Sequence, residues 1–269
     1  MPGTKKIMAT RKIRYGICIN SVNHSSILEN TGYDYYELPV SRLIGPELDD
    51  PGFKTLREDV NTHSIFPETF YLFIPPALPL TGPDRDKARI ESYLSLVLNR
   101  IHLLGGKVVG FGSGRARSIP DTITREEGML QLTEFMRTAA GIAAGYGITI
   151  AIENLETTET NVFTDIHSIG KYIKELELFN VGILFDIHHC VVQNQNIEDI
   201  ANYASFIKHI HISDTGRLNP GTGQYPIPWL FEILNNIGYT SRVTCECKWQ
   251  NFETDIKHTI EYLRNINKV

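Results

Sequence analysis

The apolar segment ILFDIHHC, residues 183–190, ends in one carboxylate and two imidazoles, Asp186, His188 and His189. These groups are costly to bury unless they are paired, hydrogen-bonded or bound to a metal. Three further apolar segments also end in a titratable side chain: Glu153 in ITIAIEN, His211 in HIHIS and Glu246 in VTCECKW. Carboxylate oxygens dominate this set, which suits one hard to borderline divalent ion. Mn²⁺ is the first expectation, Mg²⁺ and Co²⁺ are close to it, and Zn²⁺ is less natural.

Each of these residues also has an ordinary structural explanation. A single Glu that ends an apolar strand is more often a helix cap or half of a salt bridge, and a single His is more often a satisfied core residue. Four titratable residues at the ends of four successive segments are harder to explain in this way. The pattern therefore indicates the metal-dependent site of an enzyme.

Short β-rich runs alternate with longer amphipathic stretches along the whole chain, and they must position these residues. Eight strands are predicted, over residues 15–19, 35–38, 69–73, 107–110, 149–153, 181–186, 209–213 and 243–246. This alternation is typical of a (β/α)8 barrel, although an open doubly wound sheet would alternate similarly. A barrel takes its catalytic groups from the carboxyl ends of several strands, where the polar residues fall here. We therefore expect an α/β fold, a single (β/α)8 barrel over residues 12–269, after a loose tail over residues 1–11.

Two long helices are predicted between the strands. Over residues 84–105, apolar side chains recur every three or four positions and form one stripe. Over residues 124–147, Thr124 is the expected N-cap, Glu127 is at the capping-box position, and Gly145 and Gly147 mark the end. Both patterns are typical of helices that cover one side of a barrel.

Composition narrows the class of protein. The chain has 269 residues, a formal net charge of −5 and four cysteines that are not at C-x-x-C spacing. The negative charge gives no reason to expect nucleic acid or an anionic membrane as a partner, and no stretch approaches the length of a membrane span. We expect reduced thiols, a cytoplasmic location and a small-molecule substrate.

The strand-end residues resemble those of the xylose isomerase-like TIM-barrel superfamily of sugar isomerases and epimerases, most closely the ketose 3-epimerases that act on tagatose and psicose. The resemblance extends over about residues 13–266, and its diagnostic motifs lie in the second half. It implies that Glu153, Asp186, His211 and Glu246 hold one metal ion. Further family residues are matched by offset, which implies that Glu159, His189 and Arg217 face the substrate.

Epimerisation beside a carbonyl requires a base on each face of the substrate, and Glu153 and Glu246 are the natural pair. A divalent ion would stabilise the developing cis-enediolate as a Lewis acid. The resemblance implies that Asp186 is a ligand only, and that His189 and Arg217 donate hydrogen bonds to substrate oxygens. His189 is preferred to His188 for this role because of its offset, and His209 is expected in the core or behind the ligands.

Several features leave the substrate open. The Gly-rich segment 109–123 carries Arg115 and Arg117, which could hold a phosphate or carboxylate, or could be solvated arginines on a tight turn. Glu37 could hydrogen-bond a sugar hydroxyl or be structural. Phe73 and Trp249 could form an apolar wall against the sugar, although core packing is favoured for Phe73. The Pro-rich segment 73–83 could shape a lid or only close the rim.

Alternative activities use related sites. An aldose–ketose isomerase shares the enediolate chemistry, and an inosose-type dehydratase could use the same cation and bases. The superfamily's DNA-repair endonucleases bind three zinc ions, which the acidic charge and the single convincing ligand set disfavour. A non-catalytic sugar-binding barrel should lack a ligand or base, and all are present here. A homodimer or homotetramer is expected from the resemblance alone.

Overall fold

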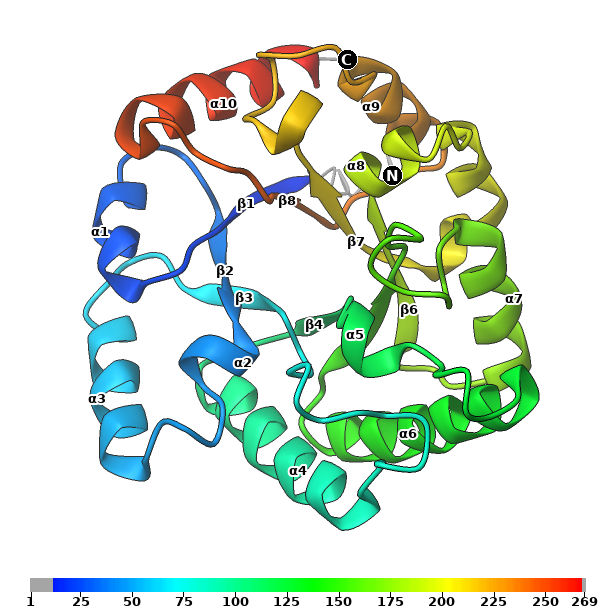
Figure 1. Ribbon diagram of the computed structural model, residues 1–269. Helices are drawn as coiled ribbons and strands as arrows, with labels where there is room; N and C mark the ends of the chain where they lie inside the picture. The colour runs from blue at the N-terminus through cyan, green and yellow to red at the C-terminus, as the bar shows by residue number, and fades with distance from the viewer. Residues whose placement is uncertain (1–11, 268–269) are drawn as a thin grey trace, which may run out of the picture.

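The computed structural model describes residues 12–267. Eight parallel strands follow one another around a closed barrel in the order β1 to β8, and helices surround them (Figure 1). The strands are β1 (Arg14–Cys18), β2 (Tyr35–Pro39), β3 (Pro67–Tyr71), β4 (Val108–Phe111), β5 (Thr149–Glu153), β6 (Val181–Asp186), β7 (Ile207–Ile212) and β8 (Arg242–Cys245). The predicted (β/α)8 barrel is confirmed, and the predicted tail over residues 1–11 lies outside the described residues.

Strand positions agree with the sequence prediction, and two strands have the predicted bounds. These are β5 and β6, whereas β3 begins and ends two residues earlier than predicted. The earlier end of β3 has a local reason, because Leu72 adopts a left-handed backbone with φ +50°, which a strand cannot continue through. Glu246 lies one residue beyond β8, but its N–H still donates to the carbonyl of Ile212 at 3.0 Å. The β8 end is therefore held against β7.

Helices of two kinds follow the strands. The longer ones form the outer ring: α3 (Asp50–Val60), α4 (Lys87–Leu103), α6 (Arg125–Gly145), α7 (Ile166–Leu176), α9 (Ile227–Asn236) and α10 (Phe252–Ile266). The short ones are α1 (Ser25–Leu28), α2 (Val40–Leu43), α5 (Gly114–Arg117) and α8 (Ile187–Val192), with 3₁₀ helices η1 (Val22–His24), η2 (Ile197–Phe206) and η3 (Thr215–Arg217). Helices α2, α5 and α8 lie inside the outer ring (Figure 1). They directly follow β2, β4 and β6 and bring polar side chains to the barrel mouth.

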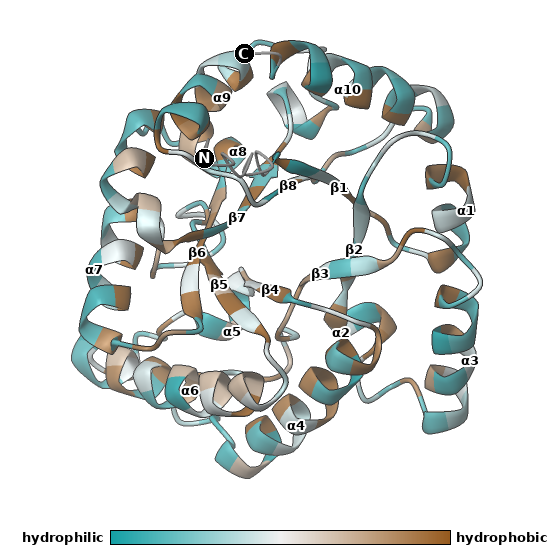
Figure 2. Ribbon diagram, turned by 180° about the vertical axis from the view of Figure 1, so that it is seen from behind, coloured by the Kyte–Doolittle hydropathy of each residue, from teal (hydrophilic) through white to brown (hydrophobic). Residues whose placement is uncertain are grey.

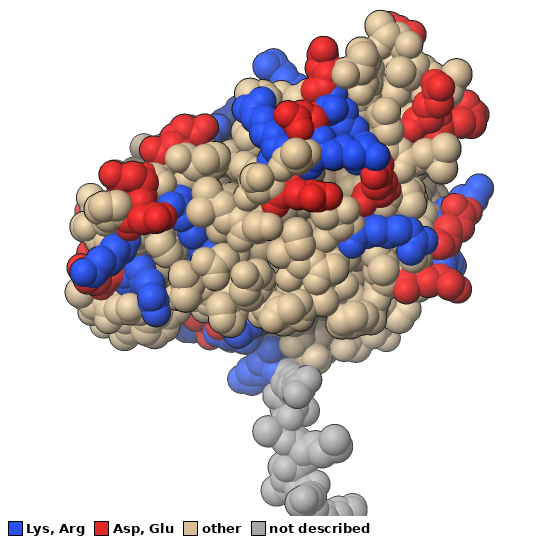
Figure 3. Space-filling view, turned by 90° about the horizontal axis from the view of Figure 1, so that it is seen from below, with Lys and Arg blue, Asp and Glu red and all other residues tan. Residues whose placement is uncertain are grey.

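The core lies between the barrel and the ring. Outer helices turn apolar residues towards the strands and polar residues outward (Figure 2). On α4 the predicted stripe is confirmed, since Ile90, Leu94, Val97 and Ile101 are all buried. Acidic and basic side chains are interspersed over the face in Figure 3. Within residues 12–267, no helix combines the length and apolar character that a bilayer crossing needs, and the four cysteines are free thiols.

The predicted start of α6 is confirmed in detail. Thr124 Oγ1 accepts from the N–H of Glu127 at 3.2 Å, and Glu127 Oε2 accepts from the N–H of Thr124 at 2.8 Å. This reciprocal capping box satisfies two backbone donors that the helix itself cannot pair.

We expect Thr124→Ala to lower the free energy of unfolding by about 1 kcal/mol, because it leaves the Glu127 N–H without its acceptor. Urea denaturation followed by circular dichroism measures the change. Thr124→Ser keeps the hydroxyl and is the matched control. Equal stability of the Ala and Ser variants would show that the cap contributes nothing.

Candidate active site

The barrel brings the four strand-end residues Glu153, Asp186, His211 and Glu246 together. One ligand atom from each lies within 4.8 Å of the others. The strand register explains this convergence, because Asp186 is directly opposite His211, and Glu153 is opposite Leu184, two positions before Asp186 on the same face. The four residues therefore meet at the carboxyl-terminal mouth of the barrel.

His211 is oriented from below by the buried carboxylate of Glu37. Its Nε2 lies 3.2 Å from Glu37 Oε1, and a carboxylate only accepts, so Nε2 carries the proton. The other nitrogen, Nδ1, is buried without a hydrogen bond and faces Glu153 and Glu246 at 3.3 and 3.7 Å. With Nε2 held by Glu37, Nδ1 is the nitrogen that can give up its proton to a divalent cation among the carboxylate oxygens, so the residues fit such a cation.

Glu37 does not lie where a substrate could reach it. The residue is fully buried, and its Oε2 accepts from Thr69 Oγ1 at 2.8 Å and from His209 Nε2 at 2.9 Å. The interpretation of Glu37 as a sugar contact is corrected, because the carboxylate is fully buried and already accepts from three protein donors. His209 lies behind the ligands, as expected.

Electrostatics differ among the buried groups. Burial opposes the charge of Glu37, but His211 and His209 outweigh it and hold the pKa of Glu37 well below its usual range. Burial likewise opposes a charged His211, but Glu37 and the neighbouring glutamates hold its pKa well above the usual range. Burial raises the pKa of Glu246 even though Arg217 opposes the shift. Without a cation, His211 and Glu246 therefore favour their protonated forms, and binding of a cation would displace these protons.

Arg217 enters the centre on a tightly held loop. Asp214 Oδ1 accepts from the N–H groups of Thr215 and Tyr225 at 2.8 and 2.9 Å, and Arg217 has a left-handed φ of +64°. Its Nη1 then donates to Glu246 Oε2 at 2.5 Å and to Asp186 Oδ2 at 3.1 Å. This strained backbone at a polar centre is typical of a functional residue.

His189 is fixed by the same guanidinium. Arg217 Nη2 lies 2.7 Å from His189 Nε2, and Arg only donates, so Nε2 accepts and the proton is on Nδ1. Nδ1 then points towards Glu156 and Glu159, at 3.4 and 3.7 Å. These three residues have metal-like spacing, but the proton on Nδ1 removes the lone pair that a metal would need.

His188 points away from the ligand set. Its Nδ1 lies 3.0 Å from the Tyr225 hydroxyl and its Nε2 lies 3.3 Å from Glu156. The structure thus places His189, and not His188, against Arg217. The sequence reasoning did not single out Glu156 and Tyr225, and only their neighbours in space connect them to the site.

A cavity of about 290 Å³ opens over these groups. Its lining includes Glu153, Glu159, His189, Arg217 and Glu246, together with Arg115 from the Gly-rich segment. This size is near the lower end of ordinary small-molecule sites. The cavity is therefore lined both by two of the four candidate ligands, Glu153 and Glu246, and by the predicted substrate-facing residues Glu159, His189 and Arg217.

Comparison with known proteins agrees with this arrangement. The profile described as xylose isomerase-like TIM barrel matches residues 26–266. The chain belongs to this family.

Individual members of the xylose isomerase-like family are only distantly similar to the chain. A D-psicose 3-epimerase from Ruminiclostridium cellulolyticum is 24% identical over 174 residues, which are 62% of this chain and 58% of that protein. A 2-oxo-tetronate isomerase from Cupriavidus necator is 28% identical over 59% of this chain and 58% of that protein. Less than two thirds of either relative is thus aligned.

Solved structures share the whole fold of this barrel. The D-psicose 3-epimerase with D-tagatose from Clostridium cellulolyticum H10 has a TM-score of 0.82 at 19% identity, covering 96% of this chain and all of that one. An L-ribulose 3-epimerase also has a TM-score of 0.82, at 16% identity, covering 95% of each chain.

In this xylose isomerase-like barrel, Arg117 is neither solvated nor available to a ligand. It is fully buried, and its Nη1 and Nη2 donate to the carbonyls of Phe111 and Glu153 at 2.7 and 2.8 Å and, more weakly, of Phe163 at 3.3 Å. Burial lowers its pKa to about 9, so it stays charged at neutral pH. Arg117 fixes the backbone that carries Glu153, which corrects both interpretations made from the sequence.

The glycines of the same segment also serve packing. A Cβ on Gly112 would lie 2.3 Å from Glu153 Oε2, and one on Gly114 would lie 2.8 Å from the backbone carbonyl of Glu159. Only glycine allows this loop to approach both residues so closely. The Gly-rich pattern is therefore explained by the protein's own contacts.

The remaining predicted residues lie at the edge of the site or outside it. Phe73 is fully buried and packs edge-on against Phe111, which agrees with the core interpretation. Trp249 is half-buried and packs edge-on against Phe252. Of the segment 73–83, Ile74 and Pro76 line the cavity.

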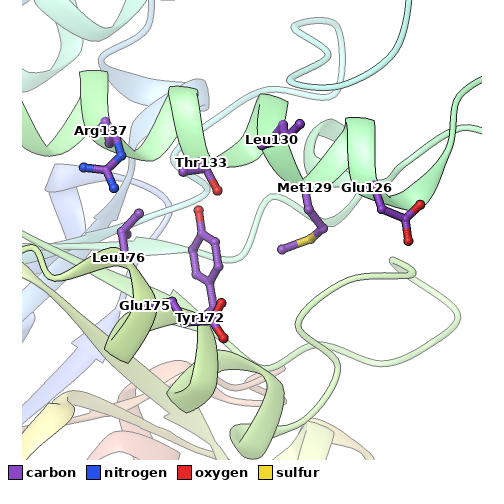
Figure 4. A pocket seen from close by; sticks show the side chains of 8 residues that line it. All are labelled: Glu126, Met129, Leu130, Thr133, Arg137, Tyr172, Glu175 and Leu176. Carbon is purple, nitrogen blue, oxygen red and sulfur yellow. The ribbon is translucent and has the colours of Figure 1, made fainter.

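A second cavity, of about 440 Å³, lies outside the barrel between α6 and α7 (Figure 4). Its side chains include the apolar Met129, Leu130 and Leu176 and the charged Glu126 and Arg137, all drawn in Figure 4. Although it is larger than the cavity at the barrel mouth, none of the metal-like clusters among residues 12–267 lies there. The cavity at the strand ends is therefore the one with residues that could hold a metal ion.

We expect Arg117→Lys to lower the free energy of unfolding by about 1–3 kcal/mol, because a single ammonium leaves at least one buried carbonyl unsatisfied. Chemical denaturation measures the loss. Arg115→Lys, two residues away and exposed, is the control and should change stability by less than about 0.5 kcal/mol. Equal stability of the two variants would contradict the role of Arg117.

Proposed function

We propose that this protein is a divalent-metal-dependent sugar epimerase that acts through a cis-enediolate, and most specifically a ketose 3-epimerase. The observation that supports it is the convergence of two glutamates, an aspartate and a correctly oriented histidine at the barrel mouth, beside Arg217 and His189. Sugar epimerases and isomerases among the relatives favour an isomerase-type enzyme.

The ligands in this proposal are Glu153, Asp186, His211 and Glu246. When bound, the cation supplies Lewis-acid stabilisation of the negative charge that develops on the substrate oxygens. The donor set is rich in oxygen and lacks sulfur, so Mn²⁺ is the first candidate, ahead of Mg²⁺, Co²⁺ and Zn²⁺.

Proton transfer is assigned to the two glutamates. One takes the proton from the carbon beside the carbonyl, and the other returns a proton to the opposite face. Burial raises the pKa of Glu246, so in the cation-free centre this carboxyl holds a proton more readily than an exposed glutamate does.

Arg217 and His189 are assigned to substrate binding. Arg217 has its Nη1 shared between Glu246 and Asp186, so a substrate oxygen near these carboxylates meets a positive donor. Its bond to His189 keeps the His189 Nδ1 proton directed towards Glu156 and Glu159. Arg217 would donate to an enediolate oxygen, and His189, whose Nε2 accepts from Arg217, would hold that guanidinium in place beside the two bases.

Aldose–ketose isomerisation is the second candidate, because curated relatives include a 2-oxo-tetronate isomerase and a hydroxypyruvate isomerase. It uses the same bases on a neighbouring carbon. An inosose-type dehydratase would expel a hydroxyl from the same site. The crystal structure of a family 2 AP endonuclease from Brucella melitensis also shares the fold, with a TM-score of 0.77 at 18% identity, but that likeness concerns the fold alone.

Deuterium exchange tests the proposal directly. Metal-reconstituted protein is incubated in D₂O with a panel of ketoses, ketose phosphates and inososes, and NMR follows the deuterium content of each carbon. We expect deuterium at C3, because both bases exchange their protons with solvent. Glu246→Gln should lower exchange by about 10²–10⁴-fold while metal content stays measurable. Glu261→Gln, exposed on α10, is the control.

Deuterium at C1 or C2 would support an isomerase instead, and loss of water a dehydratase. Full exchange in Glu246→Gln would refute the two-glutamate mechanism.

The contact of Glu37 with His211 predicts an effect on metal affinity. Glu37→Gln replaces the carboxylate by an amide, which weakens the orientation of His211 Nε2 and lowers the basicity of Nδ1. Metal affinity should fall about 10–100-fold, as measured by competition with a chromogenic chelator. Glu47→Gln on the surface should leave the affinity unchanged. A Glu37→Gln protein with wild-type affinity would show that His211 is not a ligand.

A further inference from the structure

The two walls of the mouth cavity differ in charge. The acidic residues that line it, Glu153, Glu159 and Glu246, come from the ends of β5 and β8 and the loop after β5. The opposite wall comes from the ends of β2, β3 and β4, and it contributes Ser41, Arg42, Tyr71, Ser113 and Arg115. In the closed barrel, β2–β4 lie across from β6–β8. This basic wall thus lies across the mouth from Asp186, His211 and Glu246, whereas its β4 end neighbours β5, the strand that carries Glu153.

Both arginines of this wall are exposed, and neither has a hydrogen-bond or ion-pair partner for its guanidinium within residues 12–267. Two other arginines, Arg217 on the opposite half and Arg117 on the same helix α5 as Arg115, behave differently. Arg217 is held by Asp186 and Glu246, and Arg117 by backbone carbonyls. Two positive groups without a protein counter-ion therefore line one side of a cavity that holds the reactive centre.

The basic wall is also held in place. The N–H of Ser41 donates to the carbonyl of Leu72 at 3.1 Å, and the N–H of Ile74 donates to Ser113 Oγ at 2.9 Å. These bonds connect the loops that follow β2, β3 and β4. Both Leu72 and Ser113 have left-handed φ values, +50° and +48°. Arg115 is presented by α5, which the buried Arg117 anchors two residues further on.

We infer that the substrate carries an oxyanion, a phosphate or a carboxylate, at its end remote from the metal ligands, and that Arg42 and Arg115 bind it. The inference rests on the proposed function, and it specifies the substrate class of that site. A guanidinium forms charge-assisted hydrogen bonds to either oxyanion, often two at once. The cavity of about 290 Å³ leaves the charged end of such a sugar at the open mouth, where both arginines lie.

Binding of unreactive polyols tests this without turnover. Isothermal titration calorimetry of the metal-loaded protein compares D-glucitol, D-glucitol 6-phosphate and D-gluconate, none of which has a carbonyl to react. We expect one of the two anions to bind at least ~10-fold more tightly than D-glucitol, which corresponds to about 1.4 kcal/mol. Tighter binding of the phosphate identifies a sugar phosphate, and tighter binding of gluconate identifies a sugar acid.

The arginine variants decide whether the basic wall is responsible. Arg42→Gln and Arg115→Gln should each remove most of the preference for the anion, whereas Arg57→Gln, an exposed arginine on α3, should leave it intact. Equal binding of the neutral and anionic polyols would overturn the inference, and so would an anion preference that survives in the double variant. If deuterium exchanges into a neutral ketose and the protein shows no preference for the anionic polyols, the proposed function is supported and the oxyanion subsite is rejected. If the preference for anionic polyols depends on the two arginines but no ketose takes up deuterium, the subsite is supported and the proposed function is rejected.

Discussion

A buried carboxylate inside the barrel orients the reactive centre above it. Glu37 has no solvent exposure, and its charge is compatible with burial only because Thr69, His209 and His211 all donate to it. This network has a directional consequence, because the proton on His211 Nε2 leaves Nδ1 free to face Glu153 and Glu246. An apolar residue in place of Glu37 would pack at lower desolvation cost but would no longer define which nitrogen faces the site.

The strand ends are held by contacts to the backbone rather than to the reactive atoms. Asn154 pairs with both the N–H and the carbonyl of Asp186, at 2.9 and 3.1 Å, so the ends of β5 and β6 have a fixed spacing. Arg117 holds the carbonyl of Glu153, and Asp214 holds the loop that carries Arg217. These contacts fix the backbone positions of the strand ends, so the site is preorganised before a substrate binds.

The two halves of the barrel mouth have different tasks. The half built on β5–β8 carries the four candidate ligands, among them the two candidate bases, together with His189 and Arg217. The half built on β2–β4 supplies Ser41, Arg42 and Arg115. Loop variation on a constant barrel is how this fold accommodates different substrates. Differences between relatives in the substrate are therefore expected on the β2–β4 side.

The sequence by itself determined the alternating pattern, the barrel and the four strand-end residues, because strand alternation and strand ends are local properties of the chain. It also determined the capping box of α6, whose partners are three residues apart. Only the tertiary structure decided the tasks of Glu37 and Arg117, since their partners lie up to 174 residues away. The offset in the sequence favours His189 over His188, and the tertiary structure supplies the physical reason, because the two neighbouring side chains diverge where α8 leaves β6. Burial and distant hydrogen-bond partners decide whether a polar residue is a ligand, orients another residue or lies on the surface. The spacing of residues along the chain reveals neither of them.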